Sequence, residues 1–374
     1  MNNTKVIIIG STHHNMYSML RCFGESGILP IAIIYGCEDS YIAHSVYCNE
    51  IYIVKDETAA LKLLINNKDK WCEYCIISCT DAIGSSLDLN FEALSGYYHF
   101  FNCGQQGSLT RNMNKLYQTK LAKQVCFDVP DSVEGLISEV LDCSINYPRI
   151  IKPVESIHGG KQIEICYDKS QYKQSLSAFS TDEKVIVQEF IEKEYEIVVV
   201  GLSVNENTYI PAYIHKHRDT KGGTTYSTVK TISELPINVI EACKAMSSKM
   251  QYEGLWGIEL IKKNDSYYFV EMNLRNDATT YAINIAGVNL PLIYYQIKSG
   301  LMTGVPSMQI HEIHSIVEFP DFIHVLKGEV NILTWWKQLR NAECRYLYSP
   351  KDKDAYRNNK RQFLKMLRRR ILKF

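Results

Sequence analysis

The sequence lacks the features that mark exported and membrane-spanning proteins. Its start, MNNTKVIIIGSTHHN, has no basic segment followed by a long apolar run, so we expect no signal peptide. A membrane-spanning helix needs about 20 apolar residues, and every apolar run in the sequence is much shorter. We therefore expect a cytoplasmic protein, in which the 12 cysteines are reduced thiols.

Motifs for zinc and for dinucleotides are also missing. Cys72 and Cys75 form one C-x-x-C pair, but no second pair follows at zinc-site spacing, and HEIH at 311–314 lacks a metalloprotease pattern. After the first apolar run stands GSTHHN, with one glycine where a dinucleotide-binding turn has three. These absences disfavour a zinc enzyme and leave an NAD-dependent oxidoreductase as a remote alternative.

The formal net charge is zero, but the charge is unevenly spread. Residues 351–374 carry ten Lys or Arg and two Asp, a net charge of +8, and the rest of the chain carries −8. Apolar residues recur in this segment at helical spacing, which predicts a terminal helix packed on the body of the protein. Peripheral contact with an anionic membrane surface is the alternative. No nucleic-acid-binding motif accompanies the segment, so we expect no nucleic acid partner.

The 374 residues suit two or three domains, and the pattern changes along them. Strand and helix signals alternate over the first hundred residues, which predicts a parallel, doubly wound α/β sheet. RNMNKLYQTKLAKQ (111–124) is predicted to be one helix. From residue 185 onward strands predominate, which indicates an α+β, largely antiparallel region. WGIELIKK and SYYFVEMNL are predicted to pair as a hairpin through the turn KNDS.

Polar side chains alternate where the second strand of that hairpin ends. Glu271, Asn273 and Arg275 follow one another at alternate positions, so they share one face of a strand. The hairpin brings Glu259 beside Glu271. Two carboxylates and an amide oxygen are hard ligands that suit Mg²⁺, with Mn²⁺ as a substitute, and Arg275 can bind a phosphoryl group or a carboxylate. A solvated outer face of the hairpin is the plainer interpretation.

The order of these motifs resembles the ATP-grasp superfamily, and within it the carbamoyl-phosphate-synthetase-like carboxylate–amine ligases that include D-aspartate ligase. The resemblance implies four parts: a pre-ATP-grasp domain over 1–105, an ATP-grasp subdomain with a glycine lid over 106–188, a second subdomain with the metal and substrate site over 189–320, and a C-terminal extension over 321–374. RNDATTYAINIAGVNLP (275–291) is similar to the amino-acid ligase branch in particular.

The resemblance also implies which residues bind ATP. NKLYQTKLA gives Lys115, IIKPVESIHGGK gives Lys152 and a phosphate-covering loop, and VQEFIEKEYEIVVV gives the adenine and ribose contacts. The implied nucleotide-binding set is Lys115, Lys152, His158, Gly159, Gly160, Lys161, Gln188, Glu189, Phe190, Ile191 and Glu196. The implied metal ligands are Glu259, Glu271 and Asn273.

The implied catalytic cations are Arg275, Lys216 and Arg218. Alternation along the strand places Lys216 and Arg218 on one face, with His217 turned away. KGGTTYS (221–227) is predicted to be a second lid, hinged at Gly222 and Gly223. The acceptor pocket is predicted to be bordered by Asp81, Arg218, Lys221, Asn276, Asp277, Thr279, Thr280 and Tyr281.

The resemblance implies a ligase that uses ATP and Mg²⁺ to join a carboxylate to an amine, with an acyl phosphate between the two steps. A ligase that uses ammonia, an ATP-grasp phosphotransferase and an ATP-binding regulatory protein remain alternatives. The expected partners are small-molecule carboxylate and amine substrates. A homodimer is the default expectation for the oligomeric state.

Overall fold

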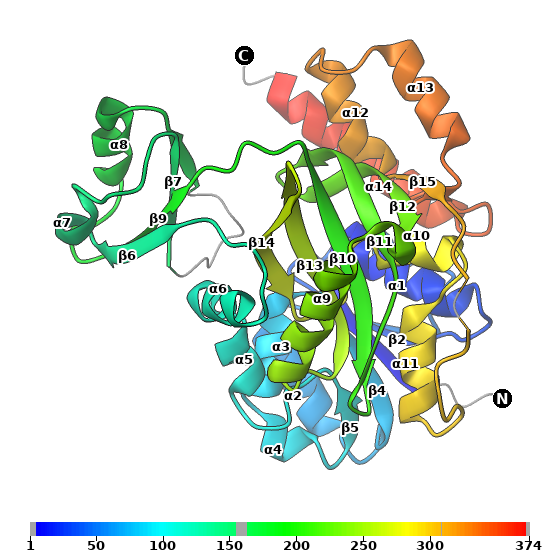
Figure 1. Cartoon of the computed structure of the whole chain (residues 1–374). Coiled ribbons are helices and arrows are strands. Elements are labelled where there is room, and N and C mark those ends of the chain that lie inside the picture. The colour runs from blue at the N-terminus through cyan, green and yellow to red at the C-terminus, as the bar shows by residue number, and fades with distance from the viewer. Residues whose placement is uncertain (1–4, 155–162, 308, 372–374) are drawn as a thin grey trace.

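The computed structural model describes residues 5–154, 163–307 and 309–371 of the chain, and the side chains as far as Arg368. Its first sheet has five parallel strands in the order β3-β2-β1-β4-β5 (Figure 1). The strands are β1 (Val6–Ser11), β2 (Ile31–Tyr35), β3 (Glu50–Val54), β4 (Tyr74–Ser78) and β5 (Tyr98–Phe100). The helices between them are α1 (His14–Gly24), η1 (Tyr41–His44), α2 (Glu57–Asn66), α3 (Asp81–Asp88) and α4 (Phe91–Leu94).

Both faces of this sheet are buried, which explains its unbroken apolar strands. Val6 and Ile8 of β1 belong to one hydrophobic cluster, and Ile7 and Ile9 belong to another on the opposite face. Parallel strands covered by helices on both sides read as continuous apolar runs rather than as alternating ones. The predicted doubly wound parallel sheet is confirmed.

The predicted helix over 111–124 is two helices, α5 (Ser108–Asn112) and α6 (Lys115–Gln124). The chain breaks at Asn114, whose side-chain oxygen accepts hydrogen bonds from the backbone N–H groups of Leu116 and Tyr117. Asparagine favours such a cap over a place inside a helix, because its side chain competes for backbone donors. The break places Lys115 at the first turn of α6.

A second, antiparallel sheet projects from the main body (Figure 1). Its order is β6-β9-β7-β8, with β6 (Ser132–Leu136), β7 (Arg149–Pro153), β8 (Glu164–Cys166) and β9 (Lys184–Glu189). The short helices α7 (Ile137–Val140) and α8 (Lys169–Leu176) cover one side of it. Ile151, Tyr172 and Val187 lie in its separate hydrophobic core.

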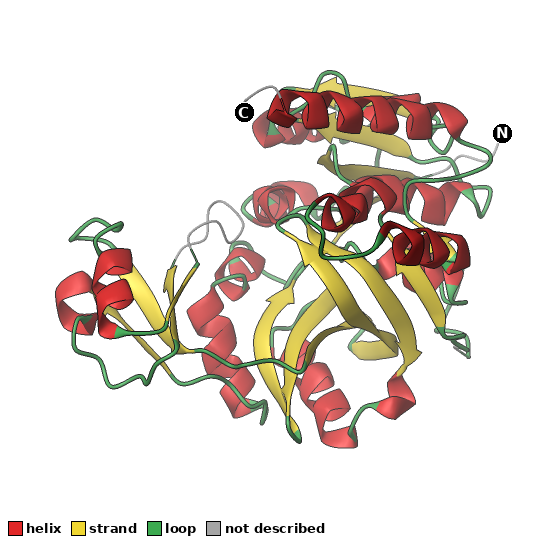
Figure 2. Ribbon diagram, turned by 90° about the horizontal axis from the view of Figure 1, so that it is seen from above, coloured by secondary structure: helices red, strands yellow, loops and turns green. Residues whose placement is uncertain are grey.

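The third sheet has seven strands in the order β14-β13-β10-β11-β12-β15-β16. It is antiparallel except for the last pair. In Figure 2 its strands lie near the centre, with the second sheet to their left. The strands are β10 (Tyr195–Val204), β11 (Asn207–Thr220), β12 (Gly223–Thr231), β13 (Gly254–Lys263), β14 (Ser266–Asn273), β15 (Ile313–Ile316) and β16 (Cys344–Arg345). The accompanying helices are η2 (Ile232–Glu234), α9 (Ile237–Lys249), α10 (Thr280–Ile285) and α11 (Leu290–Lys298).

Three further helices form the C-terminal part of the chain: α12 (Glu318–Leu326), α13 (Ile332–Asn341) and α14 (Lys353–Ile371). The predicted terminal helix packs on the body, because Phe319 of α12 stacks on Tyr356 and Phe363 of α14 at centroid distances of 5.2 and 5.4 Å. Within the described residues, no helix is long and apolar enough to span a membrane.

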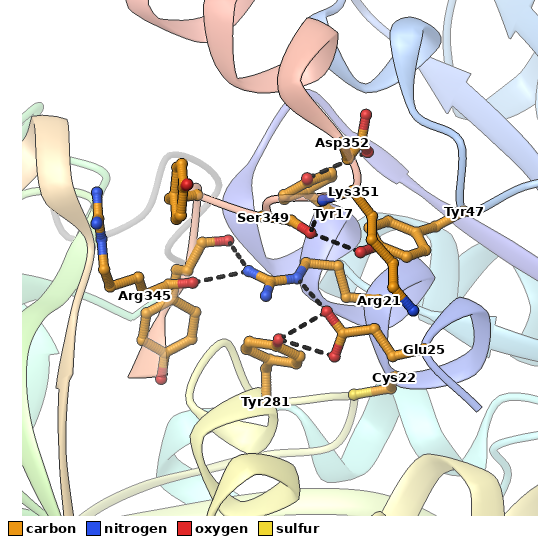
Figure 3. A network of polar contacts seen from close by, with 12 residues as sticks. Tyr17, Arg21, Cys22, Glu25, Tyr47, Tyr281, Arg345, Ser349, Lys351 and Asp352 are labelled. Atoms are coloured by element: carbon orange, nitrogen blue, oxygen red, sulfur yellow. Dashed lines mark hydrogen bonds and ion pairs between the residues drawn. The ribbon is translucent and has the colours of Figure 1, made fainter. Parts of the chain in front are cut away.

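A buried arginine joins α1 to the segment before α14 (Figure 3). Arg21 donates to the carbonyl oxygens of Arg345 at 2.7 Å and Tyr346 at 3.2 Å, and to Glu25 at 2.9 Å. Glu25 also accepts from the Tyr281 hydroxyl of α10. These contacts hold the C-terminal segment, α1 and α10 together, and α1 and α10 both begin beside the candidate site.

Candidate active site

Two carboxylates face each other across the hairpin of β13 and β14. The two-residue turn Asn264–Asp265 sets a register in which Leu260 is opposite Phe269. A β-bulge at Val270 then shifts the pairing by one residue, so that Glu259 is directly opposite Glu271 and Gly257 is opposite Asn273. Gln118 of α6 also holds β14, because its side chain donates to the Met272 carbonyl at 2.8 Å and accepts from the Met272 N–H at 2.9 Å. The predicted hairpin pairing is confirmed.

Each of these carboxylates has its own lysine. Lys115 Nζ lies 3.1 Å from Glu271 Oε2, and Lys216 Nζ lies 2.8 Å from Glu259 Oε2 and 3.3 Å from Glu196 Oε2. Burial raises the pKa of Glu259 despite Lys216, and the nearby Glu271 charge adds to that rise. For Glu271, burial is outweighed by Lys115, so its pKa falls. Lys216 has a raised pKa because neighbouring carboxylates outweigh its burial.

Arg275 connects the third sheet to the first. It lies two residues past the end of β14, and its Nε donates to Asp81 Oδ1 at 2.9 Å. Asp81 begins α3, directly after β4, so this ion pair joins residues 194 positions apart. Arg275 Nη2 donates to Asn273 Oδ1 at 3.0 Å, which orients the amide oxygen beside the two carboxylates. Arg275 is thereby a cation fixed in place, with its pKa raised by these acidic neighbours although burial opposes the rise.

A polar cavity of about 280 Å³ lies between these elements. It is bounded by the ends of β1 and β4, by the site-facing side of the third sheet, and by the turn between β11 and β12. Its lining residues are Ser11, His13, Asn15, Cys79, Thr80, Asp81, Val198, Lys216, Gly222, Gly223, Thr224, Glu259, Asn273, Arg275, Asp277, Ala278 and Thr279. Its volume and polar walls suit a small hydrophilic molecule.

The sequence-based reasoning missed His13 and Asn15 in this cavity. The His13 ring lies 3.3 Å from the Gly222 carbonyl oxygen, and burial lowers the His13 pKa, with a further lowering from Arg275. Asn15 donates to the carbonyl oxygens of Cys79 and Asn276 at 3.1 and 3.0 Å. The available signal was their position, because ligands commonly bind where parallel strands end and helices begin.

Of the predicted nucleotide-binding residues, Lys152 lies on β7 and donates to Gln188 Oε1 of β9 at 2.9 Å. Burial lowers the pKa of Lys152 to about 8, with Lys115 adding to the fall and Glu271 opposing it. Lys152, Lys115 and Glu271 therefore influence one another across the gap between the second and third sheets. His158, Gly159, Gly160 and Lys161 lie outside the described residues.

The predicted adenine and ribose contacts lie where the second sheet joins the third. Glu189 ends β9, the Phe190 N–H donates to the Pro148 carbonyl at 3.2 Å, and the Ile191 side chain is buried. Glu196, at the start of β10, pairs with Lys193 at 2.7 Å as well as with Lys216. Their roles remain predictions.

The expectation that Lys216 and Arg218 share one face is wrong. Lys216 is opposite Ser227 and Arg218 is opposite Tyr226, so His217 is an extra residue in β11 and forms a β-bulge. The bulge turns Arg218 to the other face, where its guanidinium lies 4.3 Å from the Tyr226 ring centroid. Lys216 lines the cavity, whereas Arg218 makes two hydrogen bonds to Asp321 of α12.

Among the residues that the structure describes, no group of three or more His, Cys, Asp or Glu side chains is arranged to hold a metal ion. The predicted donor set has instead two carboxylates and one amide oxygen, from Glu259, Glu271 and Asn273. Such a set fits Mg²⁺, which binds few protein ligands and completes its octahedral shell with water and phosphate oxygens.

Comparison with known proteins supports the predicted ATP-grasp fold. Residues 121–288 match the ATP-grasp domain model. Carbamoyl phosphate synthase large chain of Clostridium acetobutylicum is 26% identical over 166 residues, which are 42% of this chain and 15% of that protein. The alignment with this curated relative thus spans about a seventh of the relative's length.

Solved structures resemble most of the chain. N5-carboxyaminoimidazole synthetase from Staphylococcus aureus complexed with ADP has a TM-score of 0.67 at 14% identity, over 87% of this chain and 86% of its own. L-amino acid ligase from Bacillus licheniformis has a TM-score of 0.65 at 13% identity, over 85% and 81%. At these identities the likeness establishes the fold. Together with the match of residues 121–288 to the domain model, it shows that the chain has the ATP-grasp fold.

Proposed function

We propose that the protein is an ATP-dependent carboxylate–amine ligase that releases ADP. The observation that carries this proposal is the grouping of Glu259, Glu271 and Asn273 with three cations, Lys115, Lys216 and Arg275, at one side of a polar cavity. A site for phosphoryl transfer needs little covalent chemistry, and it needs positive charge and positioning. The remaining volume of the cavity lies beside these charges, where a second reactant can reach the transferred group.

In the first step, a carboxylate oxygen of the substrate bonds to the γ-phosphorus of ATP, and the bond from that phosphorus to the β,γ-bridging oxygen breaks. The products are an acyl phosphate and ADP. Glu259, Glu271 and Asn273 would hold Mg²⁺, which when bound would supply Lewis-acid stabilisation of the phosphate charge. Lys115 and Lys152 add point charges beside the phosphates, and Arg275 can hold the transferred group through its planar donors.

In the second step, an amine nitrogen attacks the acyl carbon, and the carbon–oxygen bond to phosphate breaks. Inorganic phosphate leaves with the former carboxylate oxygen, and the amine nitrogen loses a proton as the amide forms. The acyl phosphate reacts readily with water, so the cavity must exclude solvent around it. The polar lining favours a hydrophilic amine, and an amino acid is our proposed acceptor.

The similarity in fold to the L-amino acid ligase supports an amino acid as the acceptor. The alternative functions would use the same ATP site. A ligase that uses ammonia and an ATP-grasp phosphotransferase would carry the same cations and carboxylates. We also carry forward a cytoplasmic location and a homodimer as predictions. No observation in the described part of the chain speaks for membrane contact by the basic C-terminal helix.

The test uses hydroxylamine as a generic amine together with MgATP and pooled candidate carboxylates. Release of ADP with a hydroxamate of new mass would establish acyl-phosphate chemistry and would identify the carboxylate. AMP release, or absence of ATP binding in a thermal-shift titration, would refute the proposal. Phosphorylated product without hydroxamate would favour the phosphotransferase.

A further inference from the structure

The cavity is covered on one side by the turn between β11 and β12. We call residues 219–224 the roof, of which Gly222, Gly223 and Thr224 line the cavity. The His13 ring accepts the Asn15 N–H at Nδ1, so the neutral imidazole carries its proton on Nε2 and donates it to the Gly222 carbonyl. This contact joins the roof to the start of α1 across 209 positions of sequence.

Both ends of the roof are held by one residue, Asp321 of α12. On one side of the roof, Arg218 donates from Nε to Asp321 Oδ1 at 3.0 Å and from Nη2 to Oδ2 at 2.7 Å. On the other side, the Thr225 hydroxyl donates to Asp321 Oδ1 at 2.7 Å. The Asp321 side chain is 0% exposed, so its two oxygens interact with protein groups rather than with water.

Burying the Asp321 carboxylate between α12 and the third sheet carries a desolvation penalty. Apolar residues of similar size would pack α12 equally well. A bidentate arginine–carboxylate pair does fix geometry more strictly than apolar contact, because two parallel hydrogen bonds define an orientation. The residues fixed here are those that flank the roof. The ion pair is therefore not needed to pack α12, and its main structural effect is to fix the two residues that flank the roof.

We propose that Asp321 is a positioning residue that holds the roof closed over the acyl phosphate, so that the amine attacks it and water does not. This inference rests on the proposed function. A loosened roof admits water, which attacks the acyl carbon, returns the carboxylate and releases phosphate. The net reaction is then hydrolysis of ATP to ADP and phosphate without an amide. The first step needs only the ATP site and proceeds as before.

The experiment measures ADP and amide together in the same reaction mixture, using the carboxylate identified above and hydroxylamine as the amine. In the wild type we expect about one amide for each ADP. Asp321→Asn keeps the size of the side chain but places an N–H₂ group against Arg218, and we expect the ratio of ADP to amide to rise about tenfold. Thr225→Val removes the hydroxyl that contacts Asp321 at 2.7 Å and the Arg218 carbonyl at 3.2 Å but keeps the ion pair of Arg218 with Asp321, and we expect a rise of about threefold.

Glu318→Gln is the matched control. Glu318 is also a buried acid of α12, but it accepts from the backbone N–H groups of Leu347 and Tyr348 at 2.9 Å each, and these lie outside the roof. We expect its ratio of ADP to amide to match that of the wild type. An equal rise in Glu318→Gln, or a wild-type ratio in both roof variants, would overturn the inference.

Two checks keep the outcomes separate. If Asp321→Asn does not fold, as judged by loss of the thermal shift with MgATP, Thr225→Val decides alone, because it leaves the ion pair intact. Failure of the proposed function gives a different result, since the wild type would then form no hydroxamate. Where Asp321→Asn does not fold, a wild type that forms amide and a Thr225→Val variant that stays coupled would refute only the role of Asp321.

Discussion

Glu259 and Glu271 lie directly opposite each other on neighbouring strands, and each is ion-paired with a different lysine. Like charges at opposite positions of an antiparallel pair repel, so such a pair persists where nearby cations compensate it. Lys115 comes from α6 and Lys216 from β11, so two separate parts of the fold supply the compensation. This arrangement keeps acidic oxygens together at the edge of the cavity.

Replacing Glu271 with Gln should abolish amide formation. The substitution removes one anionic ligand from the proposed metal site and leaves Lys115 without its partner. We expect kcat to fall by at least about a thousandfold, the scale of losing a main electrostatic contribution to a transition state. Steady-state ADP release measures it. Asp265→Asn, in the exposed turn of the same hairpin, is the control and should keep the rate within about twofold. Substantial activity in Glu271→Gln would contradict the assignment.

Replacing Lys216 with Met should lower kcat about a hundredfold, because Glu196 and Glu259 would lose their shared cation. The Lys216 side chain is 8% exposed, so water cannot take its place well. Lys216→Arg should restore part of the rate, since it keeps the charge. The measurement is a comparison of kcat and KM for ATP in the two variants. A rise in KM alone, with kcat unchanged, would show that Lys216 acts only in binding.

ATP affinity should fall as the pH rises above about 8. Burial lowers the pKa of Lys152 to about 8, so the free protein loses the ammonium charge near that pH. Phosphate oxygens favour the charged form, and binding above pH 8 must therefore take up a proton, which weakens affinity by at most about tenfold per pH unit. Calorimetric titration with a non-hydrolysable ATP analogue between pH 7 and 9.5 measures the slope. Lys152→Arg should remove it, and an unchanged slope in that variant would place the titration elsewhere.

The same group should affect stability in the opposite direction. Between about pH 8 and 10.5 the unfolded chain keeps a proton on Lys152 that the folded chain has released. The unfolded state binds more protons there, so the contribution of Lys152 to the free energy of unfolding rises with pH across this window. The difference between wild type and Lys152→Arg in urea denaturation at pH 7.5 and 10 tests this sign.

Replacing Arg21 with Met should destabilise the contact between α1 and the C-terminal segment. The substitution leaves Glu25 without its cation and leaves the carbonyl oxygens of Arg345 and Tyr346 without their donor. We expect a loss of about 3 kcal/mol in the free energy of unfolding, at the lower end for a buried pair because Glu25 is partly exposed. Urea denaturation of Arg21→Met, Glu25→Gln and the double variant measures it. Strictly additive losses would show that the two side chains are not coupled.

Local sequence patterns predicted most helices and strands, and they predicted the part of the site that lies on the hairpin of β13 and β14. The apolar runs of β1, β2 and β4 indicated buried parallel strands, and the short turn indicated the hairpin that brings Glu259 beside Glu271. Both predictions succeeded because strand periodicity and hairpin pairing depend on neighbours in the chain. The interpretation of Arg275 as a fixed cation came from the same alternation. The bulge at Val270, which places the two carboxylates directly opposite each other, was not predicted.

The tertiary structure decided the rest. The bulge at His217 reversed the face of Arg218, and the contacts of Arg275 with Asp81, His13 with Gly222 and Arg218 with Asp321 join residues about a hundred to two hundred positions apart. Alternation and spacing describe which way a side chain points from its own strand. They carry no information about which distant element packs against it, and that packing is what encloses the cavity.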